Sequence, residues 1–549
     1  MIEKLVRSCP EIKRIYLLIR DKRGKDVKDR LTDLLEAQVS LIHAPPSMGY
    51  NREFASNLLF WCDCEQIFNR IKSQKNGRQV LEAKLRAIKG DITLPKFGVA
   101  KDDLVELAQE VSIVFNSAAT IRFVEPIDVA VRNNIYSVSQ LVEFCDELNG
   151  LQALVHLSTA YSNCHKRDTI HEIFYEPPMR GDQIISAVNS LKRIQDEIHL
   201  YPSIEGQLCE QDEVGEPSRS ACKPQTFYKR DRSVPNRQNV TSDLLDEFTR
   251  IALRRSNRPN TYTFTKAISE SYLLDLIKLR PERYLNEKIP VAIVRPSIVG
   301  GAWREPDVGL VDNYNGPTGA ILSLYTGALQ AMPGRGERIA DLVPVDMVAN
   351  MLLCTGWHLV NERCGRAEST GASKQPKRDR GAYVFNFVSG NRNPLRWHQV
   401  TDLIADLAYR YPSKMLARLP SSYFIRAGQL YEVYDLLNHW LPARLSDFAR
   451  GVLLRQELSG RSSALVAYSR IRQMTETLTP FTSNEWRLND ANVCALYERL
   501  PSQDRQLFQF DVAMIDWNEY IRNYIIGSRI YTLRDEARNV PAALATLRK

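Results

Sequence analysis

Short apolar runs alternate with helical segments through the first 300 residues and constrain the fold more than any other feature of this sequence. Each run fits a strand that is buried on both faces of a parallel sheet. We expect strands at 14–19, 85–89, 111–116, 153–157 and 290–294, and helices at 127–148 and 262–279. This alternation predicts an α/β fold with a doubly wound, Rossmann-type parallel sheet, which binds ligands at the carboxyl ends of its strands.

A chain of 549 residues is too long for one compact core. We expect a reductase domain over residues 1–395 and a mostly α-helical domain over 396–549. Two polar segments, near 203–242 and 363–380, have no apolar period and are predicted to be flexible insertions. The C-terminal region is rich in aromatic residues and predicts an amphipathic face over a core, with contact with a lipid surface as the alternative: Tyr423, Phe424, Tyr431, Tyr434 and Trp440.

The charge pattern excludes several classes of protein. The net charge is +8, but no dense basic stripe argues for nucleic acid. The ten cysteines are scattered, and no pairs at metal-ligand spacing predict a metal site. No apolar run reaches about 18 residues, so no transmembrane span is predicted in this sequence.

Tyr262 and Lys266 form a Tyr-x-x-x-Lys motif in one of the expected helices. Side chains four residues apart share a helix face. The ammonium group could therefore lower the pKa of the phenol from about 10 toward the working pH and make Tyr262 a proton donor. The same lysine could hold a nicotinamide ribose. Because this spacing also arises by chance, a pair on the helix surface is the alternative.

Polar residues follow the strands on both sides of this helix. Ser158 and Thr159 end the fourth expected strand, where a hydroxyl could polarise a substrate carbonyl, and a turn from Arg295 to Gly300 follows the fifth. This order is the one that an extended short-chain reductase needs around one nicotinamide. We therefore expect Pro296 and Ile298 beside the cofactor and three catalytic residues: Thr159, Tyr262 and Lys266.

Basic residues after the first expected strand favour NADPH as the cofactor. Arg20 ends this strand and Arg23 follows it; arginine suits a 2′-phosphate, whereas NAD enzymes usually place an acid there. Acidic residues are also near, so a solvated turn is the alternative. After the second strand, Asp91 is placed to meet the adenine amino group, with Ile92 beside it. Small residues after the third strand would let the cofactor pass close to the backbone: Ser117, Ala118 and Ala119.

The start of the sequence lacks an expected feature. A dinucleotide-binding domain usually opens with a strand and a Gly-rich turn, but no glycine precedes Gly24. Residues Met1 to Ser8 are typical of the end of the helix that would follow that turn. We therefore expect that this strand and turn are missing from the sequence.

Several longer segments resemble animal fatty acyl-CoA reductases, over nearly the whole chain apart from the two polar segments. Those in the first half are Leu18-Ile19-Arg20, Gly90-Asp91-Ile92, Ser117 to Phe123, Leu157 to Tyr161 and Pro259 to Tyr262. Those that follow are Arg295 to Gly300, Asp312 to Pro317, Asp341 to Asp346, Phe481 to Trp486, and Phe510-Asp511 with Asp516-Trp517.

The resemblance implies NADPH-dependent reduction of a long-chain fatty acyl-CoA to the fatty alcohol through an aldehyde, with release of CoA. It places the active tyrosine and lysine of the family at Tyr262 and Lys266, and its hydroxyl residue at Thr159 with Ser158 as neighbour. We expect the C-terminal helices to enclose the acyl chain. Family members are usually held to the cytosolic side of peroxisome or endoplasmic-reticulum membrane by further C-terminal helices. This sequence ends at Lys549, about where such helices would begin.

Two other functions stay open at this point. One is that of another extended short-chain enzyme, such as a hydroxysteroid dehydrogenase or a nucleotide-sugar epimerase, although such enzymes have no reason to carry the C-terminal segments quoted above. The other is a catalytically impaired chain without tight cofactor binding, suggested by the missing Gly-rich turn.

Overall fold

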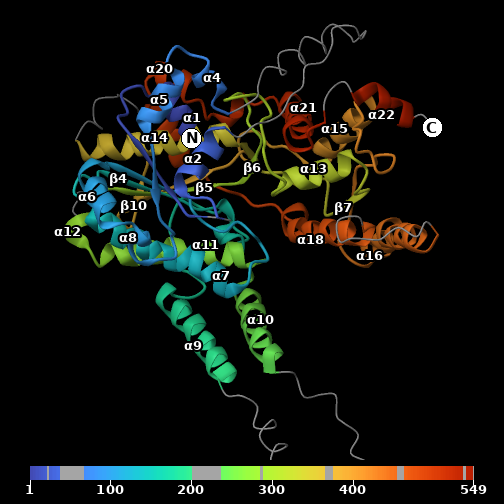
Figure 1. Ribbon diagram of the computed structural model, residues 1–549, viewed down its shortest axis with the longest axis horizontal. Coiled ribbons are helices and arrows are strands. Elements are labelled where there is room, and N and C mark those ends of the chain that lie inside the picture. Colours follow the sequence, from blue (N-terminus) through green and yellow to red (C-terminus); the bar gives the residue numbers. More distant parts are fainter. Residues whose placement is uncertain are drawn as a thin grey trace, which may run out of the picture.

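Parallel β-structure with helices on both faces forms the centre of the molecule (Figure 1). The computed structural model describes residues 1–21, 24–36, 67–200, 237–284, 289–364, 375–453, 463–535 and 539–547. Five strands form the larger sheet, in the order β3-β4-β5-β10-β9, and all but the last pair in parallel. They are β3 (Ile113–Asn116), β4 (Ala153–Leu157), β5 (Val291–Pro296), β10 (Ala382–Phe387) and β9 (Arg378–Asp379).

A second parallel pair belongs to the same architecture. β1 (Ile15–Ile19) pairs with β2 (Leu85–Lys89). The doubly wound fold has the strand order 3-2-1-4-5-6. β1 and β2 correspond to its second and third strands, and β3, β4 and β5 correspond to its fourth, fifth and sixth strands. Among the described residues, no strand pairs with both β1 and β3, and the residues of β3 are all partly exposed. The first five strands lie where the apolar runs predicted them, so the predicted doubly wound fold is confirmed.

Two short parallel pairs extend the strand ends toward the C-terminal part of the chain. β6 (Ile298–Gly300) pairs with β8 (Leu342–Pro344), and β7 (Ala331–Pro333) pairs with β11 (Tyr423–Ile425). β6 follows β5 after a single residue, so the turn after Arg295 leads directly into this second layer.

The helices before residue 300 pack mainly on the N-terminal part of the fold. They are α1 (Ile2–Ser8), α2 (Val27–Leu35), α4 (Asn69–Lys72), α5 (Gly77–Lys84), α6 (Lys101–Glu110), α7 (Ile127–Val131), α8 (Ser137–Glu147), α9 (Gly181–Leu200), α10 (Arg237–Ser256), α11 (Thr261–Lys278) and α12 (Pro281–Tyr284), with single turns η1 (Pro95–Gly98), η2 (Arg132–Tyr136) and η3 (Ala160–Asn163). The helix expected at 127–148 is α7–η2–α8, interrupted by the π-helical turn η2. α9 and α10 project together from the body (Figure 1).

The helices after residue 300 cover the opposite face and extend beyond the sheet. They are α13 (Pro317–Tyr325), α14 (Val345–Arg363), α15 (Trp397–Arg410), α16 (Gln429–Asp435), α17 (Leu441–Phe448), α18 (Ala464–Ser483), α19 (Ala491–Arg499), α20 (Ser502–Leu507), α21 (Trp517–Gly527) and α22 (Val540–Leu547), with π turns η6 (Leu436–Trp440), η7 (Ala449–Leu453) and η9 (Ser528–Thr532) and the 3₁₀ turn η8 (Val512–Met514). None of the helices in the described ranges combines the length and apolar composition that crossing a bilayer requires.

One hydrophobic cluster joins the sheet to the C-terminal helices. Val155, Val294 and Phe385 of the sheet share it with Leu496 of α19 and Tyr524 of α21. On the other face, residues of α6, α8 and α11 pack against the same strands. Burial on both faces explains why β4, β5 and β10 are almost wholly apolar. The boundary predicted between residues 395 and 396 stays a prediction, because the core runs continuously across it.

The two polar segments predicted as insertions lie partly outside the described residues. Of the first, residues 203–236 lie outside the described ranges, and α10 begins at Arg237, before the predicted end near residue 242. Of the second, residues 365–374 are outside the described ranges, while α14 extends to Arg363 and β9 uses Arg378 and Asp379.

Candidate active site

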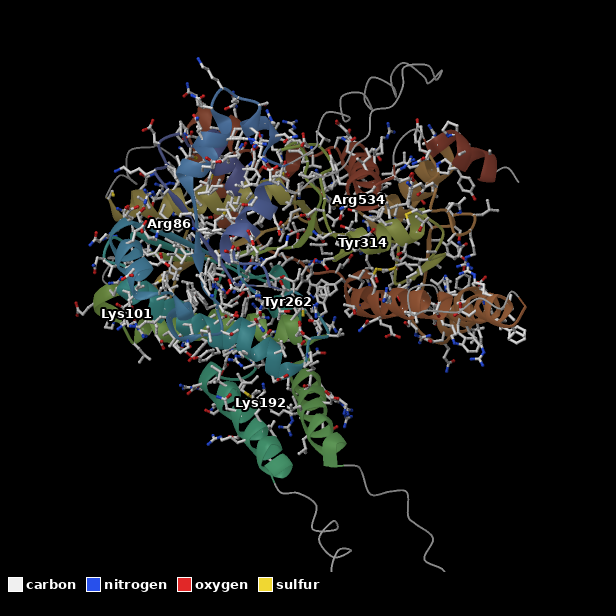
Figure 2. The ribbon with its side chains drawn as sticks, viewed as in Figure 1. Arg86, Lys101, Lys192, Tyr262, Tyr314 and Arg534 are labelled. Atoms are coloured by element: carbon white, nitrogen blue, oxygen red, sulfur yellow. The ribbon has the colours of Figure 1, made fainter. Side chains whose placement is uncertain are left out.

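A cavity of about 590 Å³ opens at the carboxyl ends of β4 and β5. Thr159, Tyr262 and Ile298 line it, so three of the residues predicted from the sequence meet in one space. Figure 2 shows Tyr262 near the middle of the molecule. A cavity of this volume, mostly apolar with a few polar groups, is typical of a small-molecule site.

Thr159 and Tyr262 are held in place by local structure. Thr159 follows β4 and caps η3, where its Oγ1 accepts a hydrogen bond from the Tyr161 backbone N–H at 3.3 Å. Tyr262 stands in the first turn of α11, which Asn260 caps through the Thr263 N–H at 2.9 Å. The Tyr262 ring meets Phe123 edge to face, with 5.3 Å between ring centroids. Both hydroxyls thus stand at the start of a helical element, facing one cavity.

Burial raises the pKa of Tyr262 to about 12, a hydrogen bond with Thr159 opposes the rise, and Glu270 adds to it. Lys266 is not among the groups that shift this pKa, so the prediction that Lys266 lowers it is wrong. Lys266 instead donates from Nζ to the Leu157 carbonyl oxygen at 2.8 Å. A phenol that stays neutral at working pH is the form that can donate a proton to a reduced carbonyl oxygen.

Lys266 is a buried ammonium group with a shifted pKa. Burial lowers the pKa of Lys266 to about 8, and the nearby carboxylate of Glu270 works against that shift. His156 lies on the neighbouring strand, where burial and the charge of Lys266 lower its pKa to about 3. His156 is therefore neutral at working pH, and its Nδ1 accepts a hydrogen bond from the Asn116 side-chain amide Nδ2 at 3.0 Å.

Glu270 belongs to a buried ion-pair network behind the catalytic residues. It continues the four-residue series of Tyr262 and Lys266 along α11. Arg295 is fully buried and donates to Glu270 from Nε at 3.1 Å and from Nη2 at 2.7 Å. The Ser158 hydroxyl also donates to Glu270. Ser158 is therefore committed to the network, and Thr159 is the hydroxyl that faces the cavity, as expected.

The residues predicted to bind the cofactor lie along one edge of the sheet, at the ends of successive strands. Arg20 is exposed after β1, and Asp91 follows β2. Burial works to raise the pKa of Asp91, but hydrogen bonds from Thr93 and, to a smaller extent, the charge of Arg20 lower it. Asp91 Oδ1 accepts from the Thr93 N–H and hydroxyl, both at 2.8 Å, and Ile92 is partly buried beside it. Arg23 lies outside the described residues.

The chemistry at this edge fits a nicotinamide cofactor. Ser117 and Ala118 are exposed and Ala119 is partly exposed after β3, so small side chains leave the strand end open. Pro296 is buried at the end of β5, next to the cavity residue Ile298. Lys266 has three N–H donors, which allows it to hold a ribose hydroxyl as well as Leu157.

The other end of the cavity is an apolar arm between C-terminal elements. α13, α15 and α18 contribute most of its wall, with β7 and β11. The residues are Ile321 and Leu324 of α13, Trp397, Val400 and Ile404 of α15, Leu478 and Phe481 of α18, Met332 of β7 and Phe424 of β11. Phe481 connects this arm to the catalytic end, because its ring contacts both Phe123 and Tyr161.

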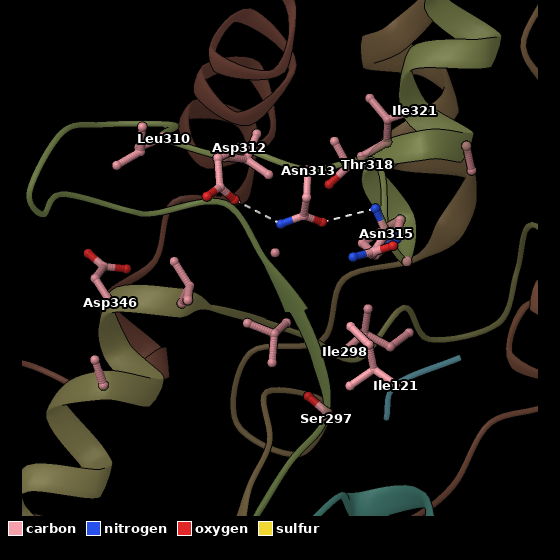
Figure 3. Close-up of a pocket in the computed structure, with 18 of the residues that line it drawn as sticks. Ile121, Ser297, Ile298, Leu310, Asp312, Asn313, Asn315, Thr318, Ile321 and Asp346 are labelled. Carbon is pink, nitrogen blue, oxygen red and sulfur yellow. Dashed lines mark hydrogen bonds between the residues drawn. The ribbon is translucent and has the colours of Figure 1, made fainter. Parts of the chain in front are cut away.

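A polar loop with Asp312, Asn313 and Asn315 also lines the cavity (Figure 3). The Asn313 side chain donates to Asp312 at 3.0 Å and accepts from the Asn315 N–H at 2.9 Å. Gly316 follows with a φ of +57°, a conformation that favours glycine. The loop leads into α13 at Pro317, so it fixes the start of a helix that lines the apolar arm.

Two functional positions were not predicted from the sequence. Glu270 could have been found from its spacing, since it lies four residues after Lys266. Asn134, in the π turn η2, accepts from the Thr120 N–H at 2.9 Å and donates to the Thr265 hydroxyl at 3.0 Å. It therefore ties the loop after β3 to the catalytic helix, a contact that no local pattern indicates.

These features define the class of the protein as an extended short-chain reductase that binds a nicotinamide cofactor. A family model for an NAD-binding domain, described as Male sterility protein, matches residues 1–352, and the Sterile model of the same description matches residues 438–535. The chain belongs to the male sterility protein family.

Known proteins are similar to the chain over its full length. It is 28% identical over 550 residues to fatty acyl-CoA reductase 1 of Xenopus laevis and of Homo sapiens, covering 100% of this chain and 85% of each relative. Fatty acyl-CoA reductase 2 of Homo sapiens is also 28% identical, with the same coverage. The resemblance inferred from the sequence motifs is confirmed.

Among solved structures, the reductase domain of a nonribosomal peptide synthetase from Mycobacterium tuberculosis has a TM-score of 0.50 at 12% identity. The two structures match over 97% of this chain and 88% of the reductase domain. At this identity the likeness supports the reductase fold alone.

Proposed function

We propose that this chain reduces long-chain fatty acyl-CoA to the fatty alcohol with NADPH. The observation that carries the proposal is a single cavity with Thr159 and Tyr262 at one end and an apolar arm at the other. An acyl thioester needs both: hydroxyls at its carbonyl and an apolar enclosure for its chain. The names of the full-length relatives agree with this substrate.

The site residues act on the carbonyl oxygen of the substrate. A bound nicotinamide supplies hydride to the carbonyl carbon. Thr159 and Tyr262 donate hydrogen bonds to the oxygen as negative charge develops there. Tyr262 then transfers its phenolic proton to that oxygen, and the ammonium group of Lys266 stabilises the phenolate that results. Collapse of the thiohemiacetal breaks the C–S bond and releases CoA as the thiol, leaving the aldehyde.

The second reduction uses the same groups. After a proton from solvent has restored the Tyr262 phenol, the aldehyde carbonyl occupies the position between Thr159 and Tyr262. A second NADPH would supply hydride to its carbon, and Tyr262 donates the proton that completes the alcohol. Each alcohol therefore consumes two NADPH and two protons and releases one CoA. The neutral phenol required in both steps agrees with the raised pKa of Tyr262.

Arg20 supports NADPH rather than NADH as the cofactor, because it is exposed at the end of β1, where the ribose 2′-position of a bound dinucleotide lies in this fold. We expect Arg20→Ala to raise KM for NADPH at least tenfold and to leave KM for NADH within about twofold. Arg250→Ala on α10 is the matched control. Equal effects on both cofactors would contradict this role.

The activity test uses the purified chain with palmitoyl-CoA and either NADPH or NADH. We expect hexadecanol by gas chromatography, one free CoA thiol per alcohol and two NADPH oxidised. Turnover of a hydroxysteroid or a nucleotide sugar, with no hexadecanol formed from palmitoyl-CoA, would favour another extended short-chain enzyme. Absence of both tight NADPH binding and turnover would favour the catalytically impaired alternative. Association with peroxisome or endoplasmic-reticulum membrane, which the resemblance implies, stays a prediction.

A further inference from the structure

The helical run Gln429–Leu453 exposes a continuous row of large apolar side chains. It comprises α16, η6, α17 and η7. The row, called the outer stripe from here on, consists of residues spaced three or four apart that are each 39–72% exposed: Leu430, Val433, Leu437, Leu441, Leu445, Phe448 and Val452. That spacing keeps them on one face of the run. The aromatic residues for which packing over a core was predicted are a different set, of which Tyr431 is buried and Phe424 packs against the main hydrophobic cluster.

The opposite face of the same run is polar and buried. Asp435 accepts from Tyr468 and, at 2.9 Å, from Arg472 of α18. His439 lies 2.9 Å from Asp435 and accepts from the Gln330 N–H at 3.0 Å. Asp447 accepts from the Ala464 and Leu465 N–H groups at the start of α18, at 2.7 and 3.1 Å. The amphipathicity of the run is inverted, with polar groups toward the protein and apolar groups outward.

Such an inverted face requires an apolar environment outside the protein. A water-soluble surface helix normally buries its apolar side, and exposed apolar patches of this extent mark interaction sites. The run lies against α18 at the edge of the molecule, away from α6 and α12 (Figure 1). Its hydrogen bonds to α18 and Gln330 fix this orientation, so the outer stripe cannot turn inward without breaking them.

The exposed charges around the outer stripe are mostly positive. Arg426, Arg444 and Arg450 are exposed, and Arg444 lies over the Trp440 ring, 5.4 Å from its centroid. Glu432 is the exposed acid of the run, and it pairs with Arg472 at 2.8 Å. The two aspartates of the run are buried. An apolar face with arginines at its border complements the acyl chains and anionic headgroups of a lipid bilayer.

We propose that the outer stripe docks this protein on the surface of an anionic lipid bilayer, as an in-plane helix that does not span it. The inference does not depend on the proposed reaction, but the position of the run in the fold suits an enzyme that acts on a long alkyl chain. Phe424 on β11, five residues before the run begins at Gln429, lines the apolar arm, and so does Leu478 on the supporting helix α18. The run is thus joined, through the chain and through α18, to elements that line the arm in which a long alkyl chain would lie.

The test measures flotation of the full chain with phosphatidylcholine vesicles, with and without phosphatidylserine, in the absence of substrate and cofactor. We expect binding that increases with phosphatidylserine and weakens with salt. The variant Leu430→Gln/Leu437→Gln/Leu445→Gln should lower the partition coefficient at least tenfold. The control Val105→Gln/Ile194→Gln/Leu279→Gln makes the same change at three exposed positions elsewhere and should leave it within twofold.

Further measurements separate the possible occupants of the stripe. Arg426→Gln/Arg444→Gln should reduce the phosphatidylserine dependence and retain weak binding. If the triple variant fails to fold, the fluorescence of Trp440 tests the unaltered stripe. The emission of Trp440 is the difference between the wild type and Trp440→Phe, and we expect brominated lipid to quench it. Absence of vesicle binding by the wild type would overturn the proposal. So would light scattering that shows a dimer which the triple variant converts to monomer, because a second copy would then cover the stripe. Both measurements are independent of acyl-CoA turnover.

Discussion

At the scale of single residues, the proposed reaction depends on protonation states that burial sets. Tyr262, with its pKa near 12, keeps its proton across the physiological range, so it can donate to a carbonyl oxygen without first being charged. Lys266, with its pKa near 8, is mostly protonated at neutral pH and can stabilise the phenolate left behind. The two shifts are opposite in sign because burial disfavours the charged form of each group.

Removal of the Tyr262 hydroxyl tests the first of these roles. We expect Tyr262→Phe to lower kcat for alcohol formation by about 10² to 10⁴, the usual contribution of a positioned proton donor. NADPH binding, followed by fluorescence titration, should change less than about threefold. Tyr272→Phe alters a phenol farther along α11 that does not line the cavity, and it should keep at least half of the activity. An active Tyr262→Phe would remove this residue from the reaction.

The second role predicts a pH dependence. Below its pKa Lys266 is an ammonium group, and as pH rises through about 8 it loses that charge. We therefore expect kcat/KM to fall on the basic side with an apparent pKa near 8. Glu270 raises the pKa of Lys266, so Glu270→Gln should move this fall to lower pH. If the basic limb of the kcat/KM profile stays at the same pH in Glu270→Gln, the role of Glu270 is structural only.

Glu270→Gln also lowers the stability of the fold, so that experiment needs a second variant as a control. Glu270→Gln leaves Arg295 charged and buried, which destabilises proteins by about 3–5 kcal/mol. Glu270→Gln/Arg295→Met removes both charges and should recover much of that stability. Because the double variant still lacks the carboxylate near Lys266, its basic limb should stay shifted. The comparison separates the electrostatic effect from the loss of fold stability.

At the scale of elements, the apolar runs predicted the strands well because burial on both faces demands apolar residues. Tyr262 and Lys266 could be placed on a helix from their spacing. Contacts between distant segments could not be predicted, since Arg295 reaches Glu270 only after β5 and α11 pack together. The exposed apolar row of 429–453 was not predicted, because periodicity finds an apolar face but does not show what covers it.

α18 offers a test of the acyl-binding arm. Phe481 contacts Phe123 near the catalytic end, and Leu478 lies about one helical turn farther along the same wall. We expect Leu478→Trp to narrow the arm and to lower kcat/KM for palmitoyl-CoA at least tenfold, while octanoyl-CoA keeps more than half of its value. Leu279→Trp, at a position 75% exposed on the surface, should change neither. Equal losses for both substrates would place the acyl chain elsewhere.

At the scale of the whole molecule, the N-terminal and C-terminal parts form one structure through both apolar and polar contacts. One hydrophobic cluster includes residues of the central sheet and of α19 and α21. Glu172, in the segment between η3 and α9, adds a buried polar link. Its carboxylate accepts from the Asn386 N–H of β10 at 3.0 Å and from the Asn492 N–H of α19 at 2.5 Å. Neither part can therefore unfold without disturbing the other.

Glu172 predicts a specific effect on stability. Glu172→Ala leaves two buried N–H groups without their acceptor, at about 1–3 kcal/mol each, and the loss should be measurable by urea unfolding. Glu176→Ala, at an exposed position in the same segment, should change stability by less than about 0.5 kcal/mol. A loss confined to one of two separate transitions would show that the parts unfold independently.

The same carboxylate also links stability to pH. Burial raises the pKa of Glu172 from its ordinary 4.5 to about 8 in the folded protein. Between these two values the folded state binds a proton that the unfolded state releases, so this group makes stability fall as pH rises from about 4.5 to 8. Glu172→Gln cannot titrate, and its unfolding free energy should depend less steeply on pH over that window than that of the wild type. Parallel pH profiles for the two proteins would show that Glu172 keeps an ordinary pKa in the fold.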